Sequence, residues 1–211
     1  MKKLLLFFSL FFGYFMAIAQ TEKGSVFLSG QLNISSHSIE SNNTTSKSNN
    51  FSFRPSTGLF ISDNWLLGVQ TNLSSSRIKD SFNSSREIQT QSTRVLIGPF
   101  VRRYFPIEEK LAFFGGLNAA YGNSRSKRDQ NTAGVLELFS KGRNFFTHID
   151  VGLTYFPKKW LGIELSAQPL SYAYLIEEGV QNNSSTSSNS FSFDLNTSSI
   201  FLGINFFLNK K

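Results

Sequence analysis

The chain of 211 residues contains no cysteine and only two histidines. Without cysteine it has no disulfide framework and no thiolate site for a metal or for redox chemistry. It also has no Gly-x-Ser-x-Gly sequence, the mark of many hydrolase nucleophiles, and no ligand cluster at a spacing that would hold a metal. After residue 19, no apolar run reaches the ~18 residues that a transmembrane helix needs. No metal, cofactor or helical membrane span is therefore expected in the mature chain.

The first nineteen residues have the layout of a secretory signal peptide. Met1-Lys2-Lys3 is a short basic start, Leu4 to Ala19 is almost entirely apolar, and Ala17-Ile18-Ala19 gives a small-x-small cleavage pattern before Gln20. An uncleaved anchor helix is the alternative, but the apolar stretch is shorter than the ~20 residues that span a bilayer. A lipoprotein would need a cysteine at the cleavage site. We therefore predict a signal peptide over residues 1–19 and one domain over residues 20–211.

The basic residues of the chain exceed the acidic ones but are not clustered. Without Lys2 and Lys3, 19 basic residues stand against 14 acidic ones. The pairs Arg102-Arg103, Lys158-Lys159 and Lys210-Lys211 lie beside aromatic residues at predicted turns and ends. This placement favours anchoring at a membrane surface and argues against nucleic-acid binding.

Apolar and polar residues alternate through the mature chain, which is the pattern of β-strands with one apolar face. In the first such segment Val26, Leu28, Leu32 and Ile34 are apolar, and the residues between them are mostly polar. Eight segments follow this rule, at residues 26–34, 51–61, 65–74, 94–105, 111–122, 145–155, 161–168 and 199–208. Each is long enough to cross a bilayer at a tilt. The phase changes between Phe193 and Ile200, which predicts a bulge near Thr197 to Ser199.

The connections between these segments alternate between short and long. Tight turns are predicted at Asp63-Asn64, Pro106 to Lys110 and Pro157 to Lys159. Long polar loops are predicted after the odd-numbered segments, at Ser41 to Asn50, Asp80 to Arg86, Ser124 to Thr132 and Gln181 to Ser190. Short turns on one side and long loops on the other are typical of outer-membrane barrels, with both termini on the periplasmic side.

A soluble sandwich or a lipocalin-like barrel would also alternate. Two features favour a membrane instead. The polar faces carry mostly Gly, Ser, Asn and Gln, which suit a narrow lumen better than an exposed sheet. Aromatic residues also gather at segment ends, as in the interfacial girdles of membrane barrels. The girdle is predicted to include Trp65, Phe105, Tyr155, Trp160, Tyr121, Tyr172 and Tyr174, with Phe60, Phe156 and Phe207 beside the short turns.

Three stretches carry a resemblance to a known family. The leader ending in Ala17-Ile18-Ala19-Gln20, the turn from Phe156 to Gly162 and the terminal strand from Phe201 to Phe207 resemble the small outer-membrane β-barrel family. The chain is especially similar to Bacteroidota members and to the transmembrane domain of outer-membrane protein A. The resemblance implies an all-β fold, an eight-stranded antiparallel up-and-down transmembrane barrel in the outer membrane. It implies no substrate.

The predicted lumen holds six charged or titratable side chains. By the alternation, Arg54, Arg94, Arg102, His148, Asp150 and Glu164 all point inward. Charges in so narrow a lumen must pair. We expect a polar network that closes the barrel. A small gated, porin-like transport barrel with His148 as a pH sensor is the alternative.

Catalysis is not expected. His148 and Asp150 share one strand face and Ser166 lies on the next segment, a grouping that a lipid-modifying enzyme could use. However, these residues face the lumen rather than lipid. We therefore expect a monomer with a structural or surface-interaction role, in contact with the bilayer and outer-membrane lipids. The Ser/Asn-rich loops are expected to form a solvated, antigen-variable cap; the alternative is a recognition tip through which an extracellular ligand would bind.

Overall fold

The computed structural model of the protein describes residues 21–41, 44–82, 86–129, 136–180, 184–193 and 200–208. The predicted signal peptide, residues 1–19, lies outside the described residues, as does the predicted bulge at residues 197–199. No helix in these ranges is both long and apolar enough to cross a membrane.

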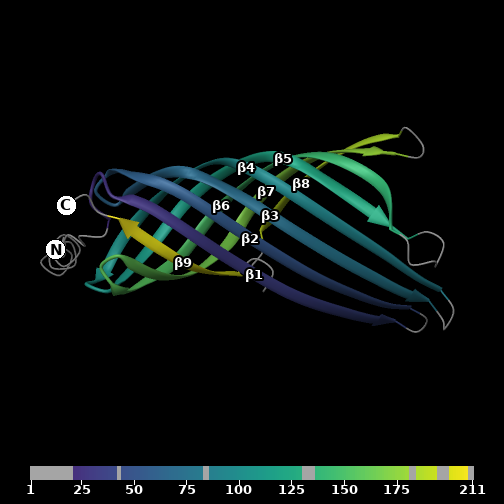
Figure 1. The fold of residues 1–211 in the computed structure, drawn as a ribbon, viewed down its shortest axis with the longest axis horizontal. Helices are drawn as coiled ribbons and strands as arrows, with labels where there is room; N and C mark the ends of the chain where they lie inside the picture. The colour runs from purple at the N-terminus through teal and green to yellow at the C-terminus, as the bar shows by residue number, and fades with distance from the viewer. Residues whose placement is uncertain are drawn as a thin grey trace, which may run out of the picture.

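Nine strands make one antiparallel sheet (Figure 1). They are β1 Val26–Ser41, β2 Thr44–Ser62, β3 Trp65–Phe82, β4 Arg86–Glu108, β5 Leu111–Arg128, β6 Glu137–Lys158, β7 Leu161–Gly179, β8 Ser185–Phe193 and β9 Ile200–Leu208.

The sheet closes on itself into a barrel. Strands β1 to β7 pair in sequence order, and β9 lies between β7 and β1. The ring therefore has eight strands, as predicted, and closure leaves no open edge at this level. The eighth predicted segment corresponds to β9, while β8 pairs with the outer part of β7 from Leu170 to Glu178. Beyond the ring, β7 and β8 extend away from β1 and β2 (Figure 1).

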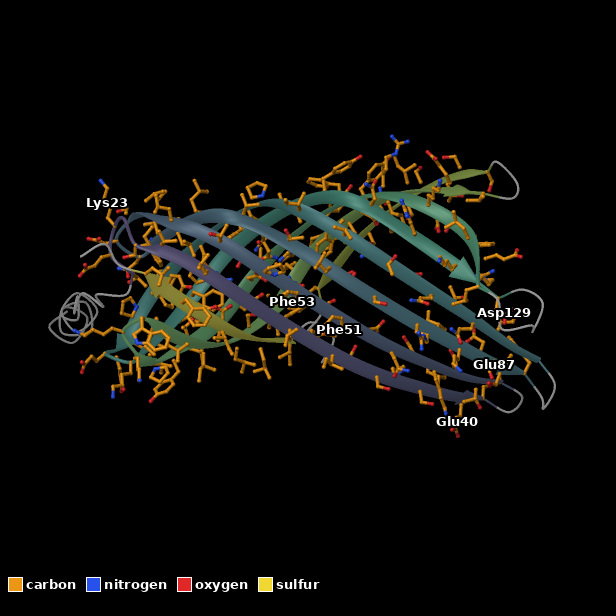
Figure 2. All side chains as sticks on the ribbon, in the orientation of Figure 1. Lys23, Glu40, Phe51, Phe53, Glu87 and Asp129 are labelled. Atoms are coloured by element: carbon orange, nitrogen blue, oxygen red, sulfur yellow. The ribbon has the colours of Figure 1, made fainter. Side chains whose placement is uncertain are left out.

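The described part of the chain begins at Thr21 and ends at Leu208, and both residues lie by the short turns. Lys23 marks that end, and Glu40, Glu87 and Asp129 mark the opposite end (Figure 2). Asn64 has a φ of 65°, a left-handed conformation that Asn tolerates in a two-residue hairpin turn. The backbone N–H of Asn64 donates to the carbonyl of Thr21 over 2.8 Å, which ties the N-terminal segment to this turn.

The long polar loops were predicted wrongly, because most of their residues belong to strands. Residues of Ser41 to Asn50 continue β1 and β2, which pair as far as Ser41 and Thr44. Likewise β5 reaches Arg128, and β8 occupies most of the segment predicted as the last loop. Ser and Asn side chains hydrogen-bond across these strands, as Ser36 Oγ donates to Asn49 Oδ1 over 2.8 Å. Such cross-strand pairs stabilise a hairpin that has no apolar face.

Side chains alternate between the outer face and the lumen, and away from the short turns the pairing shifts by one residue within β6 and within β7. In β7 the pairing with β6 shifts between Ile149 and Val151, opposite Gln168 and Pro169. A proline cannot donate to the ladder, so a bulge accommodates it. Before the bulge, the even-numbered Glu164 faces the lumen. After it, the odd-numbered Leu175 and Glu177 line a cavity that lies farther from the short turns.

Candidate functional site

The lumen near the short turns is filled with aromatic rings. The cluster, here called the aromatic floor, has side chains that are at most 3% exposed. Its members are Phe27, Phe60, Leu66, Phe100, Tyr104, Ala112, Phe114, Phe156 and Phe207. The ring of Phe207 is central, with centroids 5.5 Å from Phe27, 6.2 Å from Phe60 and 5.2 Å from Phe156. The tilted and edge-to-face ring contacts are those of a packed aromatic cluster.

Three floor residues correct the predicted girdle. Phe60, Phe156 and Phe207 were expected on the outer face beside the short turns, but all three are buried inside the barrel. The sequence did indicate the inward direction, because each of these residues lies between outward-facing neighbours on its strand. Phe60, for example, lies between the outward-facing Leu59 and Ile61, so its side chain must point inward.

Beyond the floor, a buried ion pair joins two strands that are not neighbours. Arg102 on β4 and Glu164 on β7 lie 2.8 Å apart, from NH1 to Oε2, with side chains 3% and 0% exposed. Asn205 Nδ2 donates to the same carboxylate oxygen over 2.6 Å, and Gln31 Nε2 donates to the other. With three donors, the carboxylate is well compensated for its burial.

A second buried carboxylate, that of Asp150 on β6, lies beside two more of the predicted lumen residues, Arg54 and His148. Asn118 Nδ2 donates to its Oδ2 over 2.6 Å, and Gln168 Nε2 donates to its Oδ1 over 3.1 Å. Around Oδ1 lie His148 Nε2 at 3.4 Å and Arg54 NH1 at 3.9 Å. The Arg54 guanidinium also stacks on Phe201, 3.3 Å above the ring centroid. Two arginines thus face two carboxylates, so the formal charges balance.

The structure brings together five of the six predicted lumen residues and places Arg94 elsewhere. Arg94 lines two outer cavities of about 270 and 450 Å³. The larger is walled by serines, among them Ser52, Ser74 and Ser124, and by Glu177. The charged network is therefore followed, away from the floor, by cavities with largely polar walls.

The possible catalytic grouping is not assembled. His148 and Asp150 are neighbours, but Ser166 Oγ is contacted by Gln31 Nε2 at 3.5 Å, and no bond to His148 is found among the described residues. All three side chains are buried. In the same described ranges, no group of three or more histidines and acidic residues is arranged to hold a metal ion.

The seven residues predicted for the girdle lie on the outer face. Trp65, Phe105, Tyr155 and Trp160 are near the short turns, and Tyr121, Tyr172 and Tyr174 lie farther along the strands. Their exposed fractions run from 37% for Tyr172 to 54% for Tyr121. Trp160 stacks on Phe206, with centroids 6.2 Å apart and the ring planes at 8°.

Sequence reasoning missed the neutral half of the network. Gln31, Asn118 and Asn205 supply donors to the buried carboxylates. All three lie at inward positions of their strands, so the alternation carried a signal for them. Their partners could not be named from sequence, because the pairing across the lumen depends on the closed ring.

No protein-family model matches the chain, and no curated protein matches it in sequence. Among solved structures, the outer membrane protein OprG of Pseudomonas aeruginosa aligns over 90% of this chain and 99% of its own, with a TM-score of 0.52 and 9% identity. Neisserial surface protein A covers 87% and 97% at 14% identity and a TM-score of 0.39. Ail of Yersinia pestis covers 88% and 99% at 17% identity and a TM-score of 0.34. The likeness to OprG bears on the fold alone: an eight-stranded antiparallel barrel.

Proposed function

We propose that this chain is an outer-membrane protein whose closed barrel spans the bilayer and whose outer strands and hairpins serve a structural or surface-interaction role. The proposal rests on one observation: the distribution of apolar and charged side chains is the reverse of that in a soluble barrel. Large apolar side chains such as Leu59, Leu117 and Ile163 cover the outer face, whereas the charged side chains of Arg54, Arg102, Asp150 and Glu164 are buried inside. In water so large an apolar surface would be unstable, whereas in hydrocarbon it is the required surface.

The predicted signal peptide and the antiparallel ring of eight strands support export to the outer membrane, with the termini in the periplasm. Closure supports the bilayer location as well, because unpaired backbone groups in hydrocarbon cost several kcal/mol each. The similarity to Bacteroidota members stays a prediction. We expect a monomer, since ring closure leaves no strand edge for pairing at membrane level.

Two experiments test this placement. The expressed chain should fractionate with outer membranes and resist carbonate extraction. In detergent gels, the unheated protein should migrate ahead of the heated one because the closed barrel stays compact. Recovery in the soluble periplasmic fraction, or equal mobility with and without heating, would contradict the proposal.

The lumen supports a role that needs neither conduction nor catalysis. The aromatic floor closes one end, and the Arg102–Glu164 and Arg54–Asp150 pairs lie above it. One observation favours the competing transport role: the outer cavities beside Arg94 give a ligand access from the mouth.

A lipid-modifying enzyme is the third possibility. In that case the purified protein would hydrolyse lipid and His148→Ala would remove the activity; we expect no lipid hydrolysis.

A further inference from the structure

Four basic side chains gather on the outer face of β5 and β6. Arg125, Lys127, Lys141 and Arg143 are all exposed and project from neighbouring strands. They are called the basic patch below. The patch takes no part in the lumen network.

The basic patch begins where the apolar outer face ends. Tyr121 and Phe145 are register partners, and both are exposed on the outer face. The next outward pair is Asn123 with Arg143, and the one after it is Arg125 with Lys141. Each outward step advances two residues, about 6.6 Å along a strand. The charges therefore follow directly on the aromatic belt, the level at which lipid headgroups lie.

The patch has too few carboxylates to neutralise it. Arg125 and Lys141 are directly opposite each other, an arrangement that destabilises a sheet unless an anion lies between the charges. Arg143 NH2 is paired with Glu178 Oε1 at 3.0 Å. Glu178 is also the register partner of Lys141, so one carboxylate serves this side of the patch.

A cavity of about 300 Å³ opens among these side chains. It is lined by the charged side chains of Arg125, Lys141, Arg143 and Glu178, together with Asn123, Ser124 and Gly142. Its size suits a phosphate group with part of the sugar that carries it. Guanidinium groups bind phosphate oxygens in a bidentate way, and a lysine adds a point charge.

We infer that the basic patch is a binding site for a phosphorylated lipid headgroup of the outer leaflet. The inference rests on the proposed function, because the belt must lie in a membrane for a headgroup to reach the patch. The lipid chains would lie along Tyr121 and Phe145 while the phosphate enters the cavity. Basic residues at a bilayer surface bind anionic headgroups in this manner.

The test uses the full mature chain in detergent and native mass spectrometry, with bisphosphorylated lipid A and its dephosphorylated form as probes. The wild-type protein should bind the phosphorylated lipid about tenfold or more tightly than the dephosphorylated one. Removing three charges, in R125Q/K141Q/R143Q, should abolish this preference. Equal binding of the two lipids by the wild-type protein would overturn the inference.

A matched control removes three charges from another wall. K47Q/R77Q/K79Q neutralises three basic residues of β2 and β3, where Lys47 and Lys79 are also register partners and Lys79 is paired with Glu87. This variant should keep the preference, whereas an equal loss in both variants would show that only total charge matters. Glu178→Gln removes the competing carboxylate and should tighten binding of the phosphorylated lipid, so no gain there counts against the site.

Two further readouts separate the possible failures. Inorganic phosphate in millimolar excess should not displace the lipid, and full displacement would assign the patch to a free anion instead. Heat-modifiable mobility is recorded for every variant. If the wild-type protein lacks it, both the proposed function and this inference fall. If the shift is present but the phosphate makes no difference, only the inference falls.

Discussion

Arg102 NH1 and Glu164 Oε2 lie 2.8 Å apart in the middle of the barrel, on β4 and β7, with both side chains buried. Breaking such a pair by neutralising one member leaves the other charge buried without compensation. This relationship makes the lumen network sensitive to single substitutions.

We predict that Glu164→Gln lowers the free energy of unfolding by about 3–5 kcal/mol, because Arg102 then lacks its counter-charge. Urea unfolding of the barrel in lipid vesicles, followed by tryptophan fluorescence, measures this change. The matched control is Glu178→Gln, which breaks an exposed pair with side chains 56% and 57% exposed. That loss should stay within about 1 kcal/mol. Equal effects of the two variants would contradict a buried, paired network.

Phe207→Ala should destabilise the barrel by about 3–5 kcal/mol, because it removes the central ring of the aromatic floor and leaves a cavity. Phe206, the next residue, faces outward and stacks on Trp160. Phe206→Ala should therefore cost clearly less in the same unfolding assay. If the outward variant is the more damaging one, the assignment of the two faces of β9 is wrong.

Gly152 on β6 makes room for Phe114 on the neighbouring β5. A Cβ at Gly152 would lie 2.4 Å from the backbone oxygen of Leu165 and 2.6 Å from Cζ of the Phe114 ring, whereas a Cβ at Gly115 would meet nothing within 4 Å. Gly152→Ala should cost about 1–3 kcal/mol through overpacking, and Gly115→Ala should be close to neutral. Thermal loss of the fast-migrating gel form compares the two. A stable Gly152→Ala barrel would show that the floor is loosely packed.

The alternation of apolar and polar residues predicted most of the fold. It predicted the eight-stranded ring, the three tight turns and the outward side chains such as Trp65 and Tyr121, because a strand has a period of two whatever its partners are. It also predicted that Arg54, Arg102 and Glu164 share the lumen. The common cause is local: each residue's face follows from its neighbours in the chain.

What failed depended on information beyond the single strand. Ser41 to Asn50 was predicted to be a loop from its composition, yet these residues pair because the neighbouring strands β1 and β2 extend together. Phe156 was assigned to the girdle from its position near a turn, although its parity placed it inside. The separation of Arg94 from the network follows from its place on β4, eight residues and about 26 Å along the strand from Arg102; the inward direction of both side chains does not express this distance.

Conductance in planar bilayers tests the central claim most directly, because a floor of packed rings under a paired, buried network should pass no ions. Wild-type protein inserted from detergent should give no stable unitary steps over the usual voltage range, and Glu164→Gln should not create them while the aromatic floor is intact. Stable unitary steps in the wild-type protein that Glu164→Gln alters or abolishes would contradict a sealed lumen and establish a transport barrel instead.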